Sequence, residues 1–205
     1  MSKESTIHLF RRLEQLNGIG AALSRERDIE RLLENILEAA KTITGADGGT
    51  LYSVTEDQSA LKFEILRTDS LGIRLGGTTG KPIDLPMLPL RTAEGAPNDS
   101  LVAAHSAIHD RTVNIADAYS AQGFDFSGTR AFDARTGYRS QSFLTVPMKN
   151  HDRELIGVLQ LINARDPETG EVIAFSAADQ SLAESLASQA AIALTNRLLV
   201  SQLER

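Results

Sequence analysis

Two apolar runs separated by a short polar turn constrain the fold of this chain more than any other feature. The runs cover Ser142–Met148 and Glu154–Asn163, and the turn between them reads NHDR. Runs of this length and composition on either side of a short turn predict an antiparallel β-hairpin. Pro147 lacks a backbone donor, so we expect the first strand to be bulged there or to lie partly at an edge.

The C-terminal segment predicts one long helix, from Ser176 to Leu203, that is covered on most of its surface. Ser176 is a suitable N-cap and Asp179 follows three residues later, which is typical of a capping box. No charged residue lies between Ser185 and Asn196, whereas a solvent-exposed helix alternates charged and apolar residues. One face can pack on a sheet, and the other needs the first helices or a second subunit as a partner. The sheet-facing set is Leu182, Leu186, Ala190 and Leu194.

Two helices are predicted ahead of the first strand. Residues 5–24 carry a heptad seam, and we expect a bend or break at Gly18 and Gly20. A second helix follows, with Asp28 as its N-cap and Gly45 at its end. The seam consists of Leu9, Leu13, Leu16, Gly20 and Leu23.

The middle of the chain alternates strands, loops and short helices. Frequent Pro and Gly predict an extended loop over residues 76–99, in which 83–85 pair briefly. Residues 100–111 are predicted as a helix capped by Asp99 or Ser100. The remaining expected elements are strands at 49–54, 61–67, 71–75 and 113–115 and a helix at 129–136. This order predicts an α+β fold, in which a mostly antiparallel sheet carries helices on one face and loops on the other.

Composition narrows the class of protein. The 205-residue chain carries a net charge of −6 and contains no cysteine. An acidic chain without a basic run argues against nucleic acid as a partner, and the lack of cysteine excludes disulfides, thiolate metal sites and a thioether-linked chromophore. No stretch reaches the roughly 18 apolar residues of a membrane span, and the charged N-terminus is unlike a signal peptide. We therefore expect a cytoplasmic protein without a covalent cofactor.

Few side chains have the spacing that catalysis or metal binding requires. His105 and His109 share one helical face, but no Glu lies between them and the sequence shows no third, distant ligand. We therefore predict no metal site. The GTTGK stretch at residues 77–81 lacks the spacing of a phosphate-binding loop. No histidine or carboxylate pair is assignable to general acid–base chemistry, so we predict that the chain is not an enzyme.

Four segments carry a family resemblance. They are NIADAY (114–119), the polar stretch from Asp133 to Ser140, LTVPMKN (144–150) and IGVLQLIN (156–163). Over residues 28–200 the chain resembles GAF domains, the small-molecule sensory modules of cyclic-nucleotide phosphodiesterases, cyclases and bacterial signalling proteins. The resemblance implies a sheet of about six strands, helices on one face that often dimerise and a ligand pocket on the other.

The resemblance also implies a division of the chain. Residues 1–27 are expected to form an N-terminal linker or dimerisation helix. Residues 28–205 are expected to form the sensory domain, which ends in a long signalling helix. The last helix is similar to those of GAF domains that precede HD-type phosphohydrolase or other bacterial output domains, so we expect an output domain C-terminal to it in a longer protein.

A ligand site follows from the same resemblance. Hydroxyls and exposed backbone N–H groups can hold a cyclic phosphate or a carboxylate, and a phenylalanine can stack on a base. The expected ligand-binding residues are Thr50, Val102, Ala103, Phe124, Asp133, Thr136 and Ser140.

Cyclic-nucleotide-binding members of the family carry a motif of Asn-Lys, then Phe, then Asp-Glu. Asn163, Phe175 and Asp179 match the motif in this chain. Ala164 stands in place of the lysine and Gln180 in place of the glutamate. The lysine and aspartate form an ion pair that buttresses the pocket in the family, so we expect Asp179 to lack that partner here.

Two functional hypotheses remain at this point. The first is a non-enzymatic regulatory domain that binds a small molecule such as a cyclic nucleotide and forms a homodimer through its N- and C-terminal helices. The alternative is a ligand-free dimerisation or scaffolding module with a degenerate pocket. A branch of the family that reduces free methionine sulfoxide uses cysteines, and this chain has none.

Overall fold

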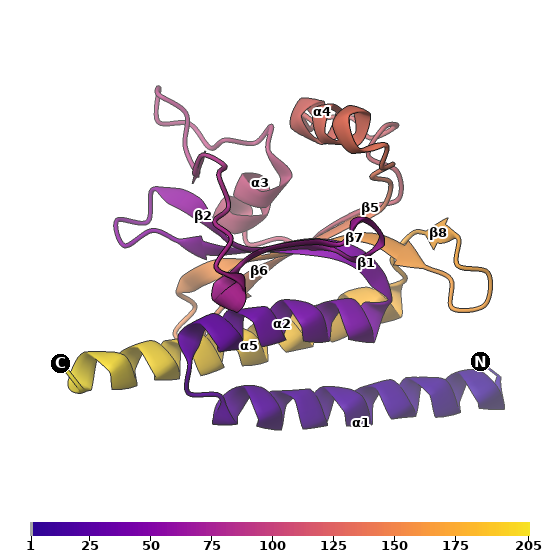
Figure 1. Ribbon diagram of the computed structural model, residues 1–205, viewed down its shortest axis with the longest axis horizontal. Coiled ribbons are helices and arrows are strands. Elements are labelled where there is room, and N and C mark those ends of the chain that lie inside the picture. Colours follow the sequence, from indigo (N-terminus) through magenta and orange to yellow (C-terminus); the bar gives the residue numbers. More distant parts are fainter. Residues whose placement is uncertain (1) are drawn as a thin grey trace.

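The computed structural model describes residues 2–205; its second helix lies directly beneath the sheet, and its first helix lies one layer further from the sheet (Figure 1). Helix α1 spans Lys3–Arg25 and helix α2 spans Ile29–Thr44. The Asp28 carboxylate accepts a hydrogen bond from the Arg31 backbone N–H at 2.9 Å, which confirms the predicted N-cap. Gly45 ends α2 in the left-handed conformation, with φ of 72°, as a C-terminal glycine usually does.

The described residues form a single open sheet in which every paired strand is antiparallel. Its main path runs in the order β3-β2-β1-β7-β6-β5, while two short strands, β4 and β8, pair at the side with β2 and β7. The predicted α+β architecture is therefore confirmed. The strands are β1 Ala46–Val54, β2 Ala60–Thr68, β3 Ile73–Gly76, β4 Leu88–Pro89, β5 Val113–Ile115, β6 Phe143–Lys149, β7 Leu155–Arg165 and β8 Val172–Ile173.

The helices divide between the two faces of the sheet (Figure 1). Helices α1, α2 and α5 (Ala177–Leu203) lie beneath one face. Helices α3 (Val102–His109) and α4 (Ser127–Thr136) lie with long loops above the other. Two short 3-10 turns, Asp69–Leu71 and Gly77–Thr79, flank β3. No helix within residues 2–205 is long and apolar enough to cross a membrane.

The main core lies between the sheet and the helices below it. Leu51, Leu159 and Leu161 alternate along β1 and β7 on this face and are fully buried. They meet Leu37 of α2 and Leu186 of α5 in one cluster. Burial of each such side chain contributes about 1.5–3 kcal/mol to folding. This layer therefore holds the helices against one face of the sheet, and a site can form on the opposite face.

Helix α5 begins with the predicted capping box and is covered by the first two helices, as predicted. The Ser176 hydroxyl accepts from the Asp179 backbone N–H at 3.0 Å, and the Asp179 carboxylate accepts from the Ser176 N–H at 2.9 Å, which completes the capping box. Helices α1 and α2 both pack on α5. Gly20 of α1 lies against the end of the Gln189 side chain of α5, which places this position at the contact between the two helices.

The predicted seam of α1 is confirmed at Leu16, Gly20 and Leu23 and wrong at Leu13, and the helix continues through Gly18 and Gly20 without the predicted break. Leu16 and Leu23 are buried as expected, but Leu13 is 45% exposed. The face against the body of the protein instead runs through Arg12, Leu16, Ile19 and Leu23, with the same steps of four and three residues. Helical spacing alone allows either seam, and the contacts with α5 select the second.

Two local expectations about the loops are wrong and a third is confirmed. Residues 83–85 form no strand; the residues of this loop that pair with β2 are those of β4. Neither Asp99 nor Ser100 caps α3, whose N-cap is Leu101 without a side-chain bond. The ladder between β6 and β7 shifts register just after Pro147, beyond the end of the β5 pairing, as the proline predicted.

Candidate ligand-binding site

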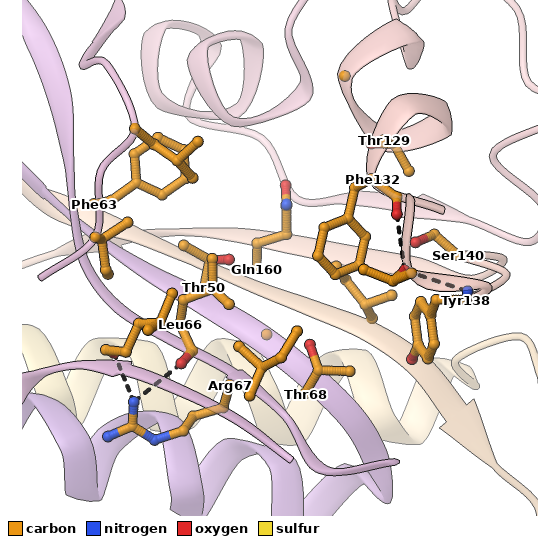
Figure 2. Close-up of a pocket in the computed structure, with 18 of the residues that line it drawn as sticks. Thr50, Phe63, Leu66, Arg67, Thr68, Thr129, Phe132, Tyr138, Ser140 and Gln160 are labelled. Atoms are coloured by element: carbon orange, nitrogen blue, oxygen red, sulfur yellow. Dashed lines mark hydrogen bonds between the residues drawn. The ribbon is translucent and has the colours of Figure 1, made fainter. Parts of the chain in front are cut away.

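A cavity of about 800 Å³ lies on the loop face of the sheet. Its floor comes from β1, β2 and β7, and its walls come from residues 72–75, residues 81–85 and helix α4 (Figure 2). Segments from the first, middle and last thirds of the chain therefore meet around one space. Clefts of this size are typical of sites for small molecules.

The floor is polar at its centre. Thr50 of β1 pairs with Gln160 of β7, and both side chains lie on the loop face because alternate residues of a strand point the same way. The Thr145 hydroxyl donates to the Gln160 side-chain oxygen at 3.1 Å. This bond uses one of the two lone pairs of the carboxamide oxygen and orients the group, and the amide NH₂ of Gln160 is free to donate to a ligand.

Aromatic rings stand at both ends of the floor. Phe63 packs on Tyr52, with ring centroids 4.7 Å apart. Phe132 of α4 meets Tyr138 edge to face, with centroids 6.3 Å apart. Figure 2 shows Phe63 and Phe132 on opposite sides of Thr50 and Gln160. A planar ligand that lies on the floor would therefore have aromatic faces or edges on either side.

Asp133 holds the wall behind the cavity together. It is 4% exposed and accepts three hydrogen bonds. The donors are the Tyr119 hydroxyl at 2.6 Å, the Ser140 backbone N–H at 2.9 Å and the Ser140 hydroxyl at 2.8 Å. The bond to Asp133 raises the pKa of the Tyr119 hydroxyl, and its burial adds to that effect. The carboxylate thus fixes Ser140, which lines the cavity, to α4 and to the segment before it.

A second buried carboxylate, Asp47, anchors Tyr138 at the edge of the cavity. The Tyr138 hydroxyl donates to Asp47 at 2.6 Å, and Ser70 donates to the same oxygen at 2.6 Å. Arg165 forms an ion pair with Asp47 at 2.8 Å. Burial, together with the bond to the Asp47 carboxylate, raises the pKa of Tyr138 well above its ordinary value of about 10. Tyr138 is therefore neutral and fixed in place at physiological pH.

The rim of the cavity is positively charged. Lys81 and Arg135 contribute cationic side chains, and Asp84 contributes a carboxylate. Arg74 lines the cavity too, but its guanidinium lies on the helix side of the sheet, 4.0 Å from Glu38 of α2. Since the whole chain has a net charge of −6, this concentration of positive charge is local. Such a rim raises the local concentration of anions and favours an anionic ligand.

Arg67 lies at the cavity floor only through its backbone. Figure 2 shows its guanidinium on the helix side of the sheet, where it donates to the carbonyl oxygens of Leu66 at 3.0 Å and Leu75 at 2.7 Å. Glu34 of α2 pairs with it at 3.2 Å. Burial lowers the pKa of Arg67, although Glu34 acts in the opposite direction. Arg67 therefore braces β3 and is not a ligand group.

The structure brings some of the predicted ligand residues together and separates others. Thr50, Thr136 and Ser140 line the cavity, and Asp133 lies directly behind Ser140. The other three predicted residues do not line it: Val102 and Ala103 are buried in the packing of α3, and Phe124 packs edge-on against His105.

The aromatic side chains, Gln160 and the cationic rim did not emerge from the sequence. Gln160 had a detectable signal, because it is the one polar residue in the apolar run VLQLI of the predicted hairpin. The rim had none, since Lys81 and Arg135 lie on two segments more than fifty residues apart in the chain. Only the fold brings them to one opening.

The three motif residues build the junction between the cavity and α5. Asn163 is buried, and its side-chain oxygen accepts from the Gln141 and Ser142 backbone N–H groups at 2.7 and 3.2 Å. Its amide donates to the Arg139 carbonyl at 2.9 Å. Phe175 is buried in the main core just before α5. These bonds fix the segment that carries Ser140 against β7.

Asp179 has a cationic partner after all, which corrects the expectation drawn from the missing lysine. The Arg12 guanidinium of α1 contacts the Asp179 carboxylate at 2.5 Å and donates to the Ile43 carbonyl oxygen at 2.8 Å. Both side chains are largely buried, at 16% and 11% exposure. Arg12 of the N-terminal helix therefore supplies the positive charge that the family's lysine would provide at the position of Ala164.

The antiparallel sheet, its layer of helices and its loop-face cavity define a sensory-domain architecture. The sequence profile of the GAF domain matches residues 28–194, and the chain belongs to the GAF domain family. Domains of this family are typically regulatory sensory modules.

Similar proteins include two phosphodiesterases. The Dual 3',5'-cyclic-AMP and -GMP phosphodiesterase 11A of Takifugu rubripes is 35% identical over 98 residues, which make up 48% of this chain and 10% of that protein. The Dual 3',5'-cyclic-AMP and -GMP phosphodiesterase 11 of Drosophila melanogaster is 35% identical over 105 residues, or 50% of this chain and 7% of that protein. The chain thus matches a tenth or less of the length of these relatives.

Solved structures share the fold. The GAF domain from Acinetobacter phosphoenolpyruvate-protein phosphotransferase superposes with a TM-score of 0.61 at 16% identity, covering 98% of this chain and 99% of that one. Free methionine-R-sulfoxide reductase from Neisseria meningitidis, in complex with its substrate, gives 0.60 at 18% identity and covers 100% and 96%. At such low identities the likeness concerns the fold alone.

Proposed function

We propose that this chain is a non-enzymatic regulatory domain whose cavity binds a small, anionic, planar ligand such as a cyclic nucleotide. The observation that carries the proposal is the combination around one cavity of a cationic rim, aromatic walls and a polar floor. Lys81 and Arg135 suit a phosphate, whereas Phe63 and Phe132 suit a base. Gln160 and Thr50, which lie on the floor between the two aromatic rings, offer hydrogen-bonding groups to the edge of the base.

Two further observations support a nucleotide over other anions. The cavity volume of about 800 Å³ exceeds what a simple phosphate or carboxylate needs. The phosphodiesterases that match half of this chain carry cyclic AMP and cyclic GMP in their names. Those names describe the whole enzymes, so the ligand of this domain rests on the cavity itself.

The signal would pass from the cavity to α5 along the chain from Ser140 to Ser142 and across one hydrogen bond to the segment that precedes α5. Ser140 lines the cavity, and Ser142, two residues later, donates from its hydroxyl to the Ile173 carbonyl oxygen at 2.7 Å. Ile173 lies just ahead of Phe175 and the α5 capping box. A ligand with different contacts to two arrangements of this segment would therefore bias the packing of α5, and with it an attached output domain.

A second candidate function, a ligand-free dimerisation module, is favoured by the exposed apolar side chains of α1 and α5. Ile7 and Phe10 of α1 are 51% and 62% exposed, and Leu199 and Leu203 of α5 are 54% and 88% exposed. Such surfaces usually mark an interface. We propose that a second copy of the chain covers them in either case, so that only ligand binding separates the two functions.

Calorimetric titration with cyclic AMP and cyclic GMP tests the proposal. We expect one nucleotide per chain for the wild type, and an affinity at least about tenfold weaker for Arg135→Gln, which removes a rim charge worth roughly 1.4 kcal/mol or more against phosphate. Arg11→Gln removes the same charge from the exposed face of α1 and is the matched control. If neither nucleotide binds, or if both variants bind like the wild type, the ligand-free module is the better account.

A further inference from the structure

Three potential metal ligands converge beside α3, away from the cavity. The His105 Nδ1 lies 3.0 Å from Asp99 Oδ1, and the His109 Nε2 lies 2.6 Å from the same oxygen. The three ligand atoms lie within 4.8 Å of one another. Spacing along the sequence identified only the two histidines, and the fold supplies the carboxylate from the loop that precedes the helix.

The helix presents the two imidazoles as a preformed pair. His105 and His109 are four residues apart on α3, so both rings lie on one face, with centroids 4.6 Å apart. The opposite face of α3, including Ala103, Ala104 and Ala107, is buried against the sheet. The helix therefore cannot rotate to separate the rings without losing that packing.

The surroundings orient the ligands and leave them accessible. The edge of Phe124 packs against His105, with centroids 5.3 Å apart, which restricts the ring. The loop that carries Asp99 is tied down next to it, because the Asn98 amide donates to the Pro89 carbonyl oxygen at 2.8 Å. The side chains of His105, His109 and Asp99 are 26%, 36% and 55% exposed, so an ion can reach them and a water molecule can complete its coordination.

We propose that Asp99, His105 and His109 bind one divalent transition-metal ion, with zinc as the preferred ion. Two imidazoles and one carboxylate are a donor set that zinc uses with an open fourth position. Ligand atoms around tetrahedral zinc lie about 3.3–3.5 Å apart, given bonds of roughly 2.0–2.1 Å. The exposed Asp99 side chain needs to withdraw by less than about 1 Å to admit the ion.

Metal binding here would fasten the loop of residues 76–99 to α3. Residues 81–85 of that loop line the ligand cavity, and Asp99 is its last residue. The site is separate from the cavity lining, so its presence does not depend on the proposed nucleotide.

Titration of the full chain with zinc chloride in a non-chelating buffer tests the site. We expect one zinc ion per chain and a higher melting temperature with zinc. Asp99→Asn and His109→Gln each should weaken binding at least about tenfold. His151→Gln removes an exposed imidazole from the hairpin turn and should leave zinc affinity unchanged.

Cobalt provides an independent readout, since its visible absorption reports coordination geometry. The wild type should give the intense bands of a four-coordinate site, and Asp99→Asn should lose them. Circular dichroism checks that the variants remain folded, as their exposed positions predict. The proposal is overturned if zinc does not saturate at one ion per chain, or if Asp99→Asn binds as tightly as His151→Gln.

Discussion

At the scale of single residues, the shape of the cavity depends on buried carboxylates that do not line it. Asp133 accepts from Tyr119 and Ser140, and Asp47 accepts from Tyr138 and Ser70. Each fixes a side chain that the sequence places on an otherwise irregular segment. The resemblance to the family singled out Asp133 as a ligand residue, and the structure shows it holding the wall from behind.

The Tyr138–Asp47 hydrogen bond should make the free energy of unfolding depend on pH. Burial and the bond to Asp47 raise its pKa in the folded state, so its stabilising contribution is complete below the pKa of the unfolded chain, near 10, and is lost as pH rises above that value. Tyr138→Phe should lower the free energy of unfolding at pH 8 by about 1.5–3 kcal/mol, because it removes a bond to a charged group.

Urea unfolding at pH 8 and at pH 10.5 checks both parts of this prediction. The wild type should lose more stability than Tyr138→Phe between the two values, since only the wild type has the raised tyrosine pKa at this position. An equal loss in both proteins would show that the Tyr138–Asp47 bond does not carry the effect.

At the scale of elements, the sequence predicted the helix ends that are set by interactions between residues close together in the chain. The capping box of α5, the Asp28 cap and the Gly45 terminus were predictable because each depends on residues within one turn. The position of Leu13 in α1 was not, since a seam through Leu13 and a seam through Arg12 both reach Leu16 with helical spacing. Long-range contacts with α5 made the choice.

The same limit applies to the candidate site. Thr50, Thr136 and Ser140 were predictable because they lie on segments that resemble the family. The rim cations and the Asp99 carboxylate were not, because nothing near them in the sequence shows which loop will face which helix. Only tertiary structure places them.

The Arg12–Asp179 ion pair provides a test of how α1 is held against α5. Arg12→Ala should lower the free energy of unfolding by about 2–4 kcal/mol, because it leaves the largely buried Asp179 carboxylate without its ion pair. Arg11→Ala, on the exposed side of the same helix, should change it by less than about 0.5 kcal/mol. Chemical denaturation of both variants compares them. Equal stabilities would show that α1 is not fastened to α5 through this pair.

At the scale of the whole molecule, the two faces of the sheet have different tasks. Helices α1, α2 and α5 cover one face of the sheet (Figure 1), where the main core lies, and the outer surfaces of α1 and α5 carry exposed apolar residues. The loop face holds the cavity and the His–Asp cluster. This arrangement separates the surface that we propose for assembly from the cavity that we propose for a ligand, with β7 and the start of α5 between them.

The assembly surface predicts a homodimer. Phe10→Glu places a charge on an exposed apolar position of α1 and should shift the protein toward monomer, weakening association at least about tenfold. Gln15→Glu adds the same charge to an exposed polar position of that helix and serves as the control. Light scattering across a concentration series measures both. A monomeric wild type, or a Phe10→Glu variant as dimeric as Gln15→Glu, would contradict this assignment.

Hydrogen exchange with and without saturating cyclic nucleotide is the most direct test of the central claim, that the loop-face cavity is the ligand site. We predict slower amide exchange in residues 72–85 and 128–140, which surround the cavity, together with a change at the start of α5. Exchange in the first half of α1, which lies on the other side of the sheet, should stay the same. Unchanged exchange around the cavity at saturating nucleotide, or protection confined to another surface, would contradict the assignment.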